Sequence, residues 1–258
     1  MLSSRVGKLA RRQRYGPRVR PVSGRSTVRL GSGYGGWVFE DTPQLHLSTI
    51  VSCGLGEDAS FDVEFAARYG ATVLLVDPTP RAVAHFAAIQ GRFGLPSELG
   101  YSATGSQPVE AYDLRRVRPE QFILIPKAIT DRNGPVEFFA PRNPEDVSYS
   151  VVNFQNDYSR TTAHIEVESI TFPDLMAEVG RPEVSLVKLD IEGAEILAIP
   201  QMIRAGILPG QILIEFDELN RPSRRARANF DAVHGDLLAT GYRPIHFDGR
   251  SCVSYTRS

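Results

Sequence analysis

The segment TIVSCGLGED, residues 49–58, is the most informative stretch of the chain. It begins with a short β-rich run, Thr49–Cys53, and continues into Gly54 and Gly56. Glycine has no side chain and tolerates a positive φ, so a loop of this kind lets a ligand approach the backbone closely. Apolar residues then recur at helical spacing over Ser60–Tyr69. The segment therefore predicts a strand, a glycine turn and a helix.

The next apolar run, ATVLLV at residues 71–76, is typical of a strand covered on both faces. Asp77 ends it, about 20 positions after Gly56, which is the separation expected in nucleotide-binding βαβ units. A carboxylate at this place can accept hydrogen bonds from both hydroxyls of a ribose. We therefore predict a nucleotide site here. The alternative is a tight turn followed by an Asp that caps a helix.

Strand-like and helix-like segments alternate along the rest of the chain. The predicted helices are Pro80–Gln90, Glu192–Ala205 and Arg221–Ala239, and the predicted strands are Phe122–Ile125, His164–Glu168, Val184–Leu189 and Gln211–Phe216. Hairpins are expected at Ala128–Thr130 with Val136–Phe139, and at Pro244–Phe247 with Cys252–Tyr255. Residues 140–162 are polar and predict a long binding loop. This order predicts an α/β fold with a mostly parallel central sheet and an antiparallel C-terminal strand.

The N-terminal segment differs in composition from the rest. It is rich in arginine and contains no acidic residue before residue 40, and a glycine-rich stretch follows at residues 31–36. We expect residues 1–36 to be a basic, flexible tail and linker, and residues 37–258 to form one domain that begins with Trp37 and Phe39. An organelle transit peptide is the other reading of the tail.

Charge and cysteine content narrow the class of protein. The formal net charge is −1, which gives no support for a nucleic-acid partner or a membrane surface. No apolar stretch approaches the roughly 18 residues of a membrane span. The two cysteines, Cys53 and Cys252, form no disulfide framework, so we expect a reducing, cytoplasmic location. A homo-oligomer is left open.

Two carboxylates next to the glycine turn favour a cationic ligand. Residues 54–59, GLGEDA, also fit the looser pattern that binds a dinucleotide pyrophosphate at a helix N-terminus. Glu57 and Asp58 would repel that phosphate, whereas S-adenosylmethionine carries an ammonium and a sulfonium group. We therefore predict S-adenosylmethionine as the methyl-donating cofactor. An NAD-dependent oxidoreductase and a nucleotide-binding module without catalysis are the alternatives.

A second cluster, KLDIEGAE, covers residues 188–195. Lys188 and Asp190 lie two positions apart on a predicted strand, so their side chains share a face. Asp190 ends that strand, at the carboxyl edge where open α/β sheets bind ligands. Glu192 and Glu195 follow in the next helix, where proximity to the positive end of the helix dipole is another explanation for acidic residues. A helix cap is the alternative role for Asp190.

These motifs resemble the FkbM family of methyltransferases. The resemblance covers roughly residues 37–220 and rests on residues 188–195, on VSCGLGED at 51–58 with Phe61, on DPTP at 77–80, and on KAI at 127–129 with GPVEF at 134–138. It implies a Rossmann-like class I methyltransferase fold and O-methylation of a small molecule or saccharide. Many members carry Asp-x-Gly at the first loop, where this chain has Ser52-Cys-Gly54.

The resemblance also implies roles for individual residues. Gly54 and Gly56 would line the methionine and ribose end of the donor, Asp77 would hold the ribose, and Lys127 and Ala128 would lie near adenine. Glu57 or Asp58 could replace the missing first-loop carboxylate. The full expected cofactor set is Cys53, Gly54, Leu55, Gly56, Asp58, Asp77, Pro78, Lys127 and Ala128.

Methyl transfer to an alcohol requires a group that removes the hydroxyl proton. Asp190 would face the methyl group and is the candidate base, with Lys188 and Glu192 nearby. Asp190, Glu215 and Asp217 offer the oxygen ligands that Mg²⁺ prefers, so a metal is conceivable but not favoured. In the alternative interpretation, Glu215 and Asp217 shape the acceptor pocket without a metal.

Overall fold

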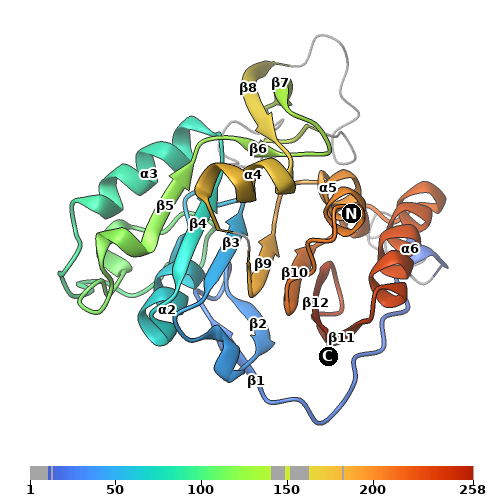
Figure 1. Ribbon diagram of the computed structural model, residues 1–258, viewed down its shortest axis with the longest axis horizontal. Coiled ribbons are helices and arrows are strands. Elements are labelled where there is room, and N and C mark those ends of the chain that lie inside the picture. The colour runs from blue at the N-terminus through green and yellow to red at the C-terminus, as the bar shows by residue number, and fades with distance from the viewer. Residues whose placement is uncertain (1–10, 13, 141–148, 152–162, 182, 258) are drawn as a thin grey trace, which may run out of the picture.

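The computed structural model describes residues 11–12, 14–140, 149–151, 163–181 and 183–257. Its centre is a seven-stranded sheet (Figure 1). The strands are β3 (Thr49–Cys53), β4 (Thr72–Val76), β5 (Phe122–Ile125), β9 (Leu186–Leu189), β10 (Gln211–Glu215), β11 (Tyr242–Phe247) and β12 (Cys252–Arg257). Their order across the sheet is β11-β12-β10-β9-β3-β4-β5.

Strand direction confirms the predicted α/β class. β3, β4, β5, β9 and β10 pair in parallel, whereas β12 runs antiparallel to both β10 and β11. From β3 the chain moves outward through β4 to β5, and it later returns to β9 on the other side of β3. The strand order therefore reverses between β3 and β9, and ligands bind at such a reversal in open α/β sheets.

Within the described part of the chain, five helices cover the two faces of this sheet (Figure 1). α2 (Ser60–Tyr69) and α3 (Pro80–Gln90) share a core with Ile50 and Val73 on one face. α4 (Phe172–Val179), α5 (Glu195–Arg204) and α6 (Arg224–Ala239) share a core with Val51 and Leu74 on the other. None of the helices in the described ranges has the length and apolar character that a membrane crossing needs.

Three helices differ from the sequence expectation. α6 begins at Arg224 rather than at Arg221, because the Ser223 side chain caps the helix there by accepting from Ala226 N. α5 begins at Glu195 rather than at Glu192, because Glu192 and Gly193 have φ values of 54° and 98° and form a turn. α4 was not predicted. It is only eight residues long and has a proline in its first turn, where a proline is tolerated because that N–H has no partner within the helix.

The glycine-rich stretch at residues 31–36 is a connection inside a hairpin, not the linker expected from its composition. It joins β1 (Thr27–Leu30) to β2 (Trp37–Glu40), and these two strands pair antiparallel. Trp37 and Phe39 are buried, as expected, and the Phe39 ring packs in a tilted contact 5.4 Å from that of Phe65. The hairpin therefore belongs to the folded body.

Side chains attach this hairpin to the central sheet. The Gln211 side chain accepts from Glu40 N at 2.8 Å and donates to Glu40 O at 2.8 Å, as a neighbouring strand would. Thr256 donates to the Glu40 carboxylate at 2.8 Å, and Ser254 donates to Val38 O. β1 and β2 nevertheless form a separate sheet.

A third, small sheet contradicts the first predicted hairpin. β6 (Ala128–Ile129) and β7 (Gly134–Phe139) do not pair with each other, because β8 (His164–Ile170) lies between them. Asn133 accepts from Thr171 N at 2.9 Å and donates to Asp174 at 2.8 Å, so it ties its turn to the start of α4. Most of the predicted loop at 140–162 lies outside the described residues. Short 3-10 helices at Pro43–Leu45, Val109–Ala111, Pro119–Gln121 and Asp217–Asn220 complete the fold.

Replacing Gln211 by alanine should weaken the attachment of the hairpin to the sheet. Gln211→Ala leaves the N–H and C=O groups of Glu40 buried without partners, which we expect to lower the free energy of unfolding by about 2–4 kcal/mol. Urea unfolding measures this. Gln44→Ala is the control, because Gln44 is exposed and should change stability by less than about 0.5 kcal/mol. Equal stability of the two variants would contradict the attachment.

Candidate active site

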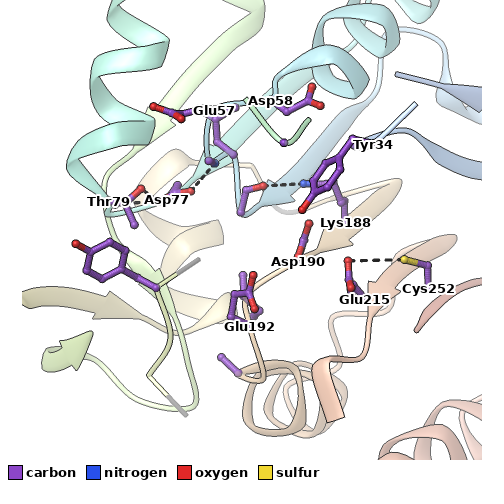
Figure 2. A pocket seen from close by; sticks show the side chains of 18 of the residues that line it. Tyr34, Glu57, Asp58, Asp77, Thr79, Lys188, Asp190, Glu192, Glu215 and Cys252 are labelled. Carbon is purple, nitrogen blue, oxygen red and sulfur yellow. Dashed lines mark hydrogen bonds between the residues drawn. The ribbon is translucent and has the colours of Figure 1, made fainter. Parts of the chain in front are cut away.

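A cavity of about 1070 Å³ opens where the parallel strands end (Figure 2). Its wall combines the loop after β3, the turn after β4, the ends of β9 and β10, and the β1–β2 connection. The predicted site residues that line it are Gly54, Leu55, Gly56, Asp58, Asp77, Pro78, Lys127, Ala128, Lys188, Asp190 and Glu192. The structure therefore brings together segments that lie far apart in the sequence.

The close approach of Gly54 to Asp190 fixes the centre of this wall. Gly54 has a φ of 83°, and a Cβ added there would lie 1.8 Å from the carbonyl oxygen of Asp190. The Asp190 N–H donates to Cys53 O at 3.2 Å. Only glycine fits, because any other side chain would overlap the backbone of the neighbouring strand.

The Lys188 side chain contacts the same part of the wall, at the end of β3. Its ammonium group donates to Gly54 O at 2.8 Å and to Cys53 O at 3.4 Å, and the residue is only 4% exposed. The ammonium also lies 5.7 Å from the centre of the Trp37 ring. Lys188 lines the cavity as predicted, but its contacts anchor the end of β3.

Asp77 connects the glycine loop to the turn before α3. One of its carboxylate oxygens accepts from Gly56 N at 2.9 Å, and the other accepts from Thr79 N at 2.8 Å and from the Thr79 hydroxyl at 2.7 Å. Thr79 in turn caps α3 by accepting from Ala82 N. Asp77 thus has a structural role and also faces the cavity.

Asp58 occupies the N-terminal end of α2. Its carboxylate accepts from Ser60 N at 2.9 Å and from the Ser32 hydroxyl at 2.7 Å. The adjoining N–H of Ala59 donates to the Tyr112 hydroxyl at 2.9 Å. Glu57 lies beside it and pairs with Arg81 at 3.5 Å. Protein groups therefore satisfy the N–H groups of Ala59 and Ser60 at the start of this helix.

Asp190 lies among other carboxylates at the far side of the glycine loop (Figure 2). Burial and the charge of Glu215 raise its pKa to about 7, with Lys188 opposing the shift. Glu215 accepts from the Ser251 hydroxyl at 3.0 Å and from Asn220 at 3.3 Å. All five histidines are described and none lines the cavity, so carboxylates are the titratable bases there.

The two glutamates after Asp190 have different surroundings. Glu192 lines the cavity from a left-handed backbone conformation, which is costly for a residue with a Cβ and is found most often at functional sites. Glu195 is fully buried and accepts from Ile191 N at 3.2 Å, so it closes the turn before its own helix. Burial and nearby Glu218 raise the pKa of Glu195.

Several predicted residues have other roles than expected. Cys53 is not part of the cavity wall, because its side chain points into the core shared with α4, α5 and α6. Lys127 lines the cavity, but its ammonium pairs with Glu178 at 2.6 Å. Asp217 is buried away from the wall. No group of three or more His, Cys, Asp or Glu side chains suited to a metal ion occurs among the described residues.

The residues on one side of the cavity were not predicted from the sequence. Tyr34, the turn at residues 104–106, Arg221, Asp248 and Arg250 all line it. Tyr34 was not predicted, because its glycine-rich surroundings are typical of a linker. The others lie in loops without a motif, so only the folded structure brings them to the site.

The family model of the methyltransferase FkbM domain matches residues 24–244, which is most of the chain. The chain belongs to the FkbM methyltransferase family. No curated protein sequence matches it. A methyltransferase needs a methyl donor and an acceptor, and the cavity at the strand ends brings residues 188–194 together with the glycine loop.

The Gly54 contact predicts a strong effect of a single methyl group in this FkbM methyltransferase. Gly54→Ala should destabilise the fold and disturb the cavity, because its Cβ would lie 1.8 Å from Asp190 O. Gly94→Ala is a matched control, since Gly94 has the same φ of 83° and no atom within 4 Å of an added Cβ. We expect Gly54→Ala to lower the thermal midpoint by several degrees more than Gly94→Ala. Equal midpoints would show that strain in φ, not the contact, explains Gly54.

The raised pKa of Asp190 predicts how stability depends on pH. Between its ordinary value of 3.8 and about 7, the folded state binds more protons than the unfolded state, so stability falls as pH rises through this window. Asp190→Asn removes the contribution of Asp190 to this fall in stability. The variant should match the wild type near pH 4 and exceed it at pH 8 by an amount on the order of a few kcal/mol. Urea unfolding at both pH values measures this. A variant that is less stable at pH 8 would contradict the shift.

Proposed function

We propose that this FkbM methyltransferase uses S-adenosylmethionine to methylate a hydroxyl oxygen of a small molecule or saccharide. We also assign it the Rossmann-like class I methyltransferase fold and a cytoplasmic location. The mostly parallel sheet with an antiparallel strand β12 supports the fold, and the two unpaired cysteines support the location. The choice of cofactor rests on the start of α2.

The Asp58 carboxylate at the N-terminus of α2 argues against a dinucleotide. A pyrophosphate binds such a helix end through free N–H groups and the positive end of the helix dipole. Here Asp58 takes the N–H of Ser60, and Tyr112 takes that of Ala59. A phosphate would meet a carboxylate instead of donors. A nucleoside without phosphate, carrying positive charge, fits this end of the cavity better than NAD does.

The glycine loop and Asp77 suit the nucleoside part of the donor. A carboxylate can accept about four hydrogen bonds, and three reach Asp77 from Gly56 and Thr79. It therefore keeps capacity for a ribose hydroxyl. Lys127 and Ala128 follow β5 on the same wall, where adenine would lie, and Pro78 lies beside Asp77.

Asp190 is the residue we assign to the proton of the acceptor. When bound, the donor supplies a methyl group already activated by its sulfonium. The protein's task is then to align the acceptor oxygen and to take its proton. A pKa of about 7 suits Asp190 for that exchange near neutral pH. Lys188 positions the loop beside it, and Glu192 lies on the same wall.

Binding measurements test the cofactor. Calorimetry should show that the purified protein binds S-adenosylmethionine and S-adenosylhomocysteine, and that NADH gives no heat of binding. The reverse preference would support the oxidoreductase alternative and contradict the proposal. Binding of neither nucleoside would contradict it as well.

Turnover tests the chemistry. With methyl-labelled donor and a panel of hydroxylated small molecules and saccharides, label should pass to an oxygen, and kcat should rise with pH through about 7 as Asp190 loses its proton. Asp190→Asn should bind S-adenosylhomocysteine but transfer no label. Unchanged turnover in this variant would exclude Asp190 as the base. EDTA should leave activity unchanged, and a loss that Mg²⁺ restores would establish the metal alternative.

A further inference from the structure

Hydrogen bonds hold the β1–β2 connection in one conformation. The Ser32 hydroxyl accepts from Gly35 N at 2.8 Å and from Tyr34 N at 3.2 Å, and it donates to Asp58 at 2.7 Å. The Arg29 guanidinium donates to the carbonyl groups of Ser32 at 2.5 Å and of Gly31 at 3.1 Å. The connection is therefore preorganised against the start of α2.

Tyr34 is presented by this connection at the mouth of the cavity. The residue is 69% exposed, and its hydroxyl has no hydrogen bond to any other described residue. Its ring packs on the backbone of Gly105, where an added Cβ would lie 2.8 Å from the ring. The contact with Gly105 and the bonds of the connection therefore hold an exposed aromatic ring on the cavity wall.

The tyrosine faces the catalytic end of the cavity. Its hydroxyl is directed toward Asp190 (Figure 2). Partial burial raises its pKa, and the charges of Asp190, Glu215 and Glu192 raise it further while Arg250 opposes them. The phenol therefore stays neutral at physiological pH. A neutral ring among carboxylates cannot act as a base, but its face can attract a cation.

The rings of Tyr34 and Trp37 differ in whether a protein cation lies over them. The ammonium of Lys188 lies over Trp37, at 5.7 Å from the ring centre. Among the residues that the structure describes, no Lys or Arg lies over the ring of Tyr34. The cation that this ring can take must therefore come from a ligand.

We propose that Tyr34 is a donor-recognition residue whose ring covers the sulfonium of S-adenosylmethionine and distinguishes it from the neutral thioether of the product. This inference rests on the proposed function. When the methyl group leaves the sulfur for the acceptor oxygen, the sulfur loses its positive charge and the attraction to the ring ends. Tyr34 thereby favours binding of the donor and release of S-adenosylhomocysteine.

The ratio of two dissociation constants tests this role. Calorimetry on the full-length protein gives Kd for S-adenosylmethionine and for S-adenosylhomocysteine in the wild type, Tyr34→Phe and Tyr34→Leu. A cation–ring contact changes affinity by about 2- to 30-fold. We expect Tyr34→Leu to weaken donor binding by such a factor with product binding nearly unchanged, and Tyr34→Phe to keep the wild-type ratio.

Two further variants complete the test. Leu47→Ala removes another exposed side chain, 83% exposed and outside the cavity wall, and should leave both constants unchanged. Ser32→Ala loosens the connection and should shift the ratio in the same direction as Tyr34→Leu. Thermal unfolding checks that each variant is folded, which we expect for Tyr34 because its side chain has no hydrogen bond to lose.

The outcomes separate this inference from the proposed function. An equal loss of affinity for both nucleosides, or no loss for either, in folded Tyr34→Leu overturns the role of Tyr34 alone. A loss in Tyr34→Phe as large as in Tyr34→Leu shows that the hydroxyl acts and overturns the contact through the ring. A wild-type protein that binds neither nucleoside overturns the proposed function and this inference together.

Discussion

The backbone of Gly54 lies directly against the carbonyl group of Asp190, and the site depends on that contact. It joins β3 and β9, the two strands between which the strand order reverses. Parallel strands end at one edge of the sheet, so the contact places Asp190 next to the glycine loop that Asp77 fixes from the other side. Lys188 donates to the carbonyl groups at the end of β3 and strengthens the same junction. Two motifs more than a hundred residues apart thus become one surface.

The site concentrates negative charge at a cost in stability. Burial raises the pKa values of Asp190 in the cavity wall and of Glu195 and Glu218 outside it, and the proximity of Glu218 adds to the effect for Glu195. A fold selected for stability alone would replace some of these carboxylates with neutral side chains. Lys188 compensates only part of this charge, because its ammonium donates to carbonyl groups rather than to a carboxylate. A proton or a cationic ligand can neutralise these carboxylates. They are therefore suited to a reaction in which a proton and a cationic ligand both take part.

Sequence patterns predicted the parts of the fold that depend on local chemistry. The runs at residues 49–53, 60–69 and 80–90 form the predicted strand and helices because their periodicity and their glycine and proline signals agree. The hairpin around Asn133 was wrong, because the side chain of this residue bonds to the start of α4 instead of closing a two-strand turn. The start of α5 was placed too early, since a left-handed glutamate has no signature in a single sequence.

The residues of the candidate site also divide into those that the sequence predicts and those that it does not. Gly54, Asp77 and Asp190 could be placed at the cavity because strand ends in a parallel sheet share one edge. The contact of Asp58 with Ser32 and the anchoring of the β3 end by Lys188 could not be foreseen, because in each case the partner lies far away in the sequence. Tyr34 was missed because glycine-rich composition is ambiguous between a linker and a tightly held turn, and only the bonds of Ser32 distinguish them.

The way β2 is joined to the sheet has a consequence for how such enzymes diversify. β2 is held by hydrogen bonds from the side chains of Gln211, Ser254 and Thr256. It shares no ladder of backbone hydrogen bonds with the seven-stranded sheet. An insertion or deletion between β1 and β2 therefore leaves the register of the seven strands untouched. Evolution can remodel the entrance of the cavity while the residues at its base keep their spacing.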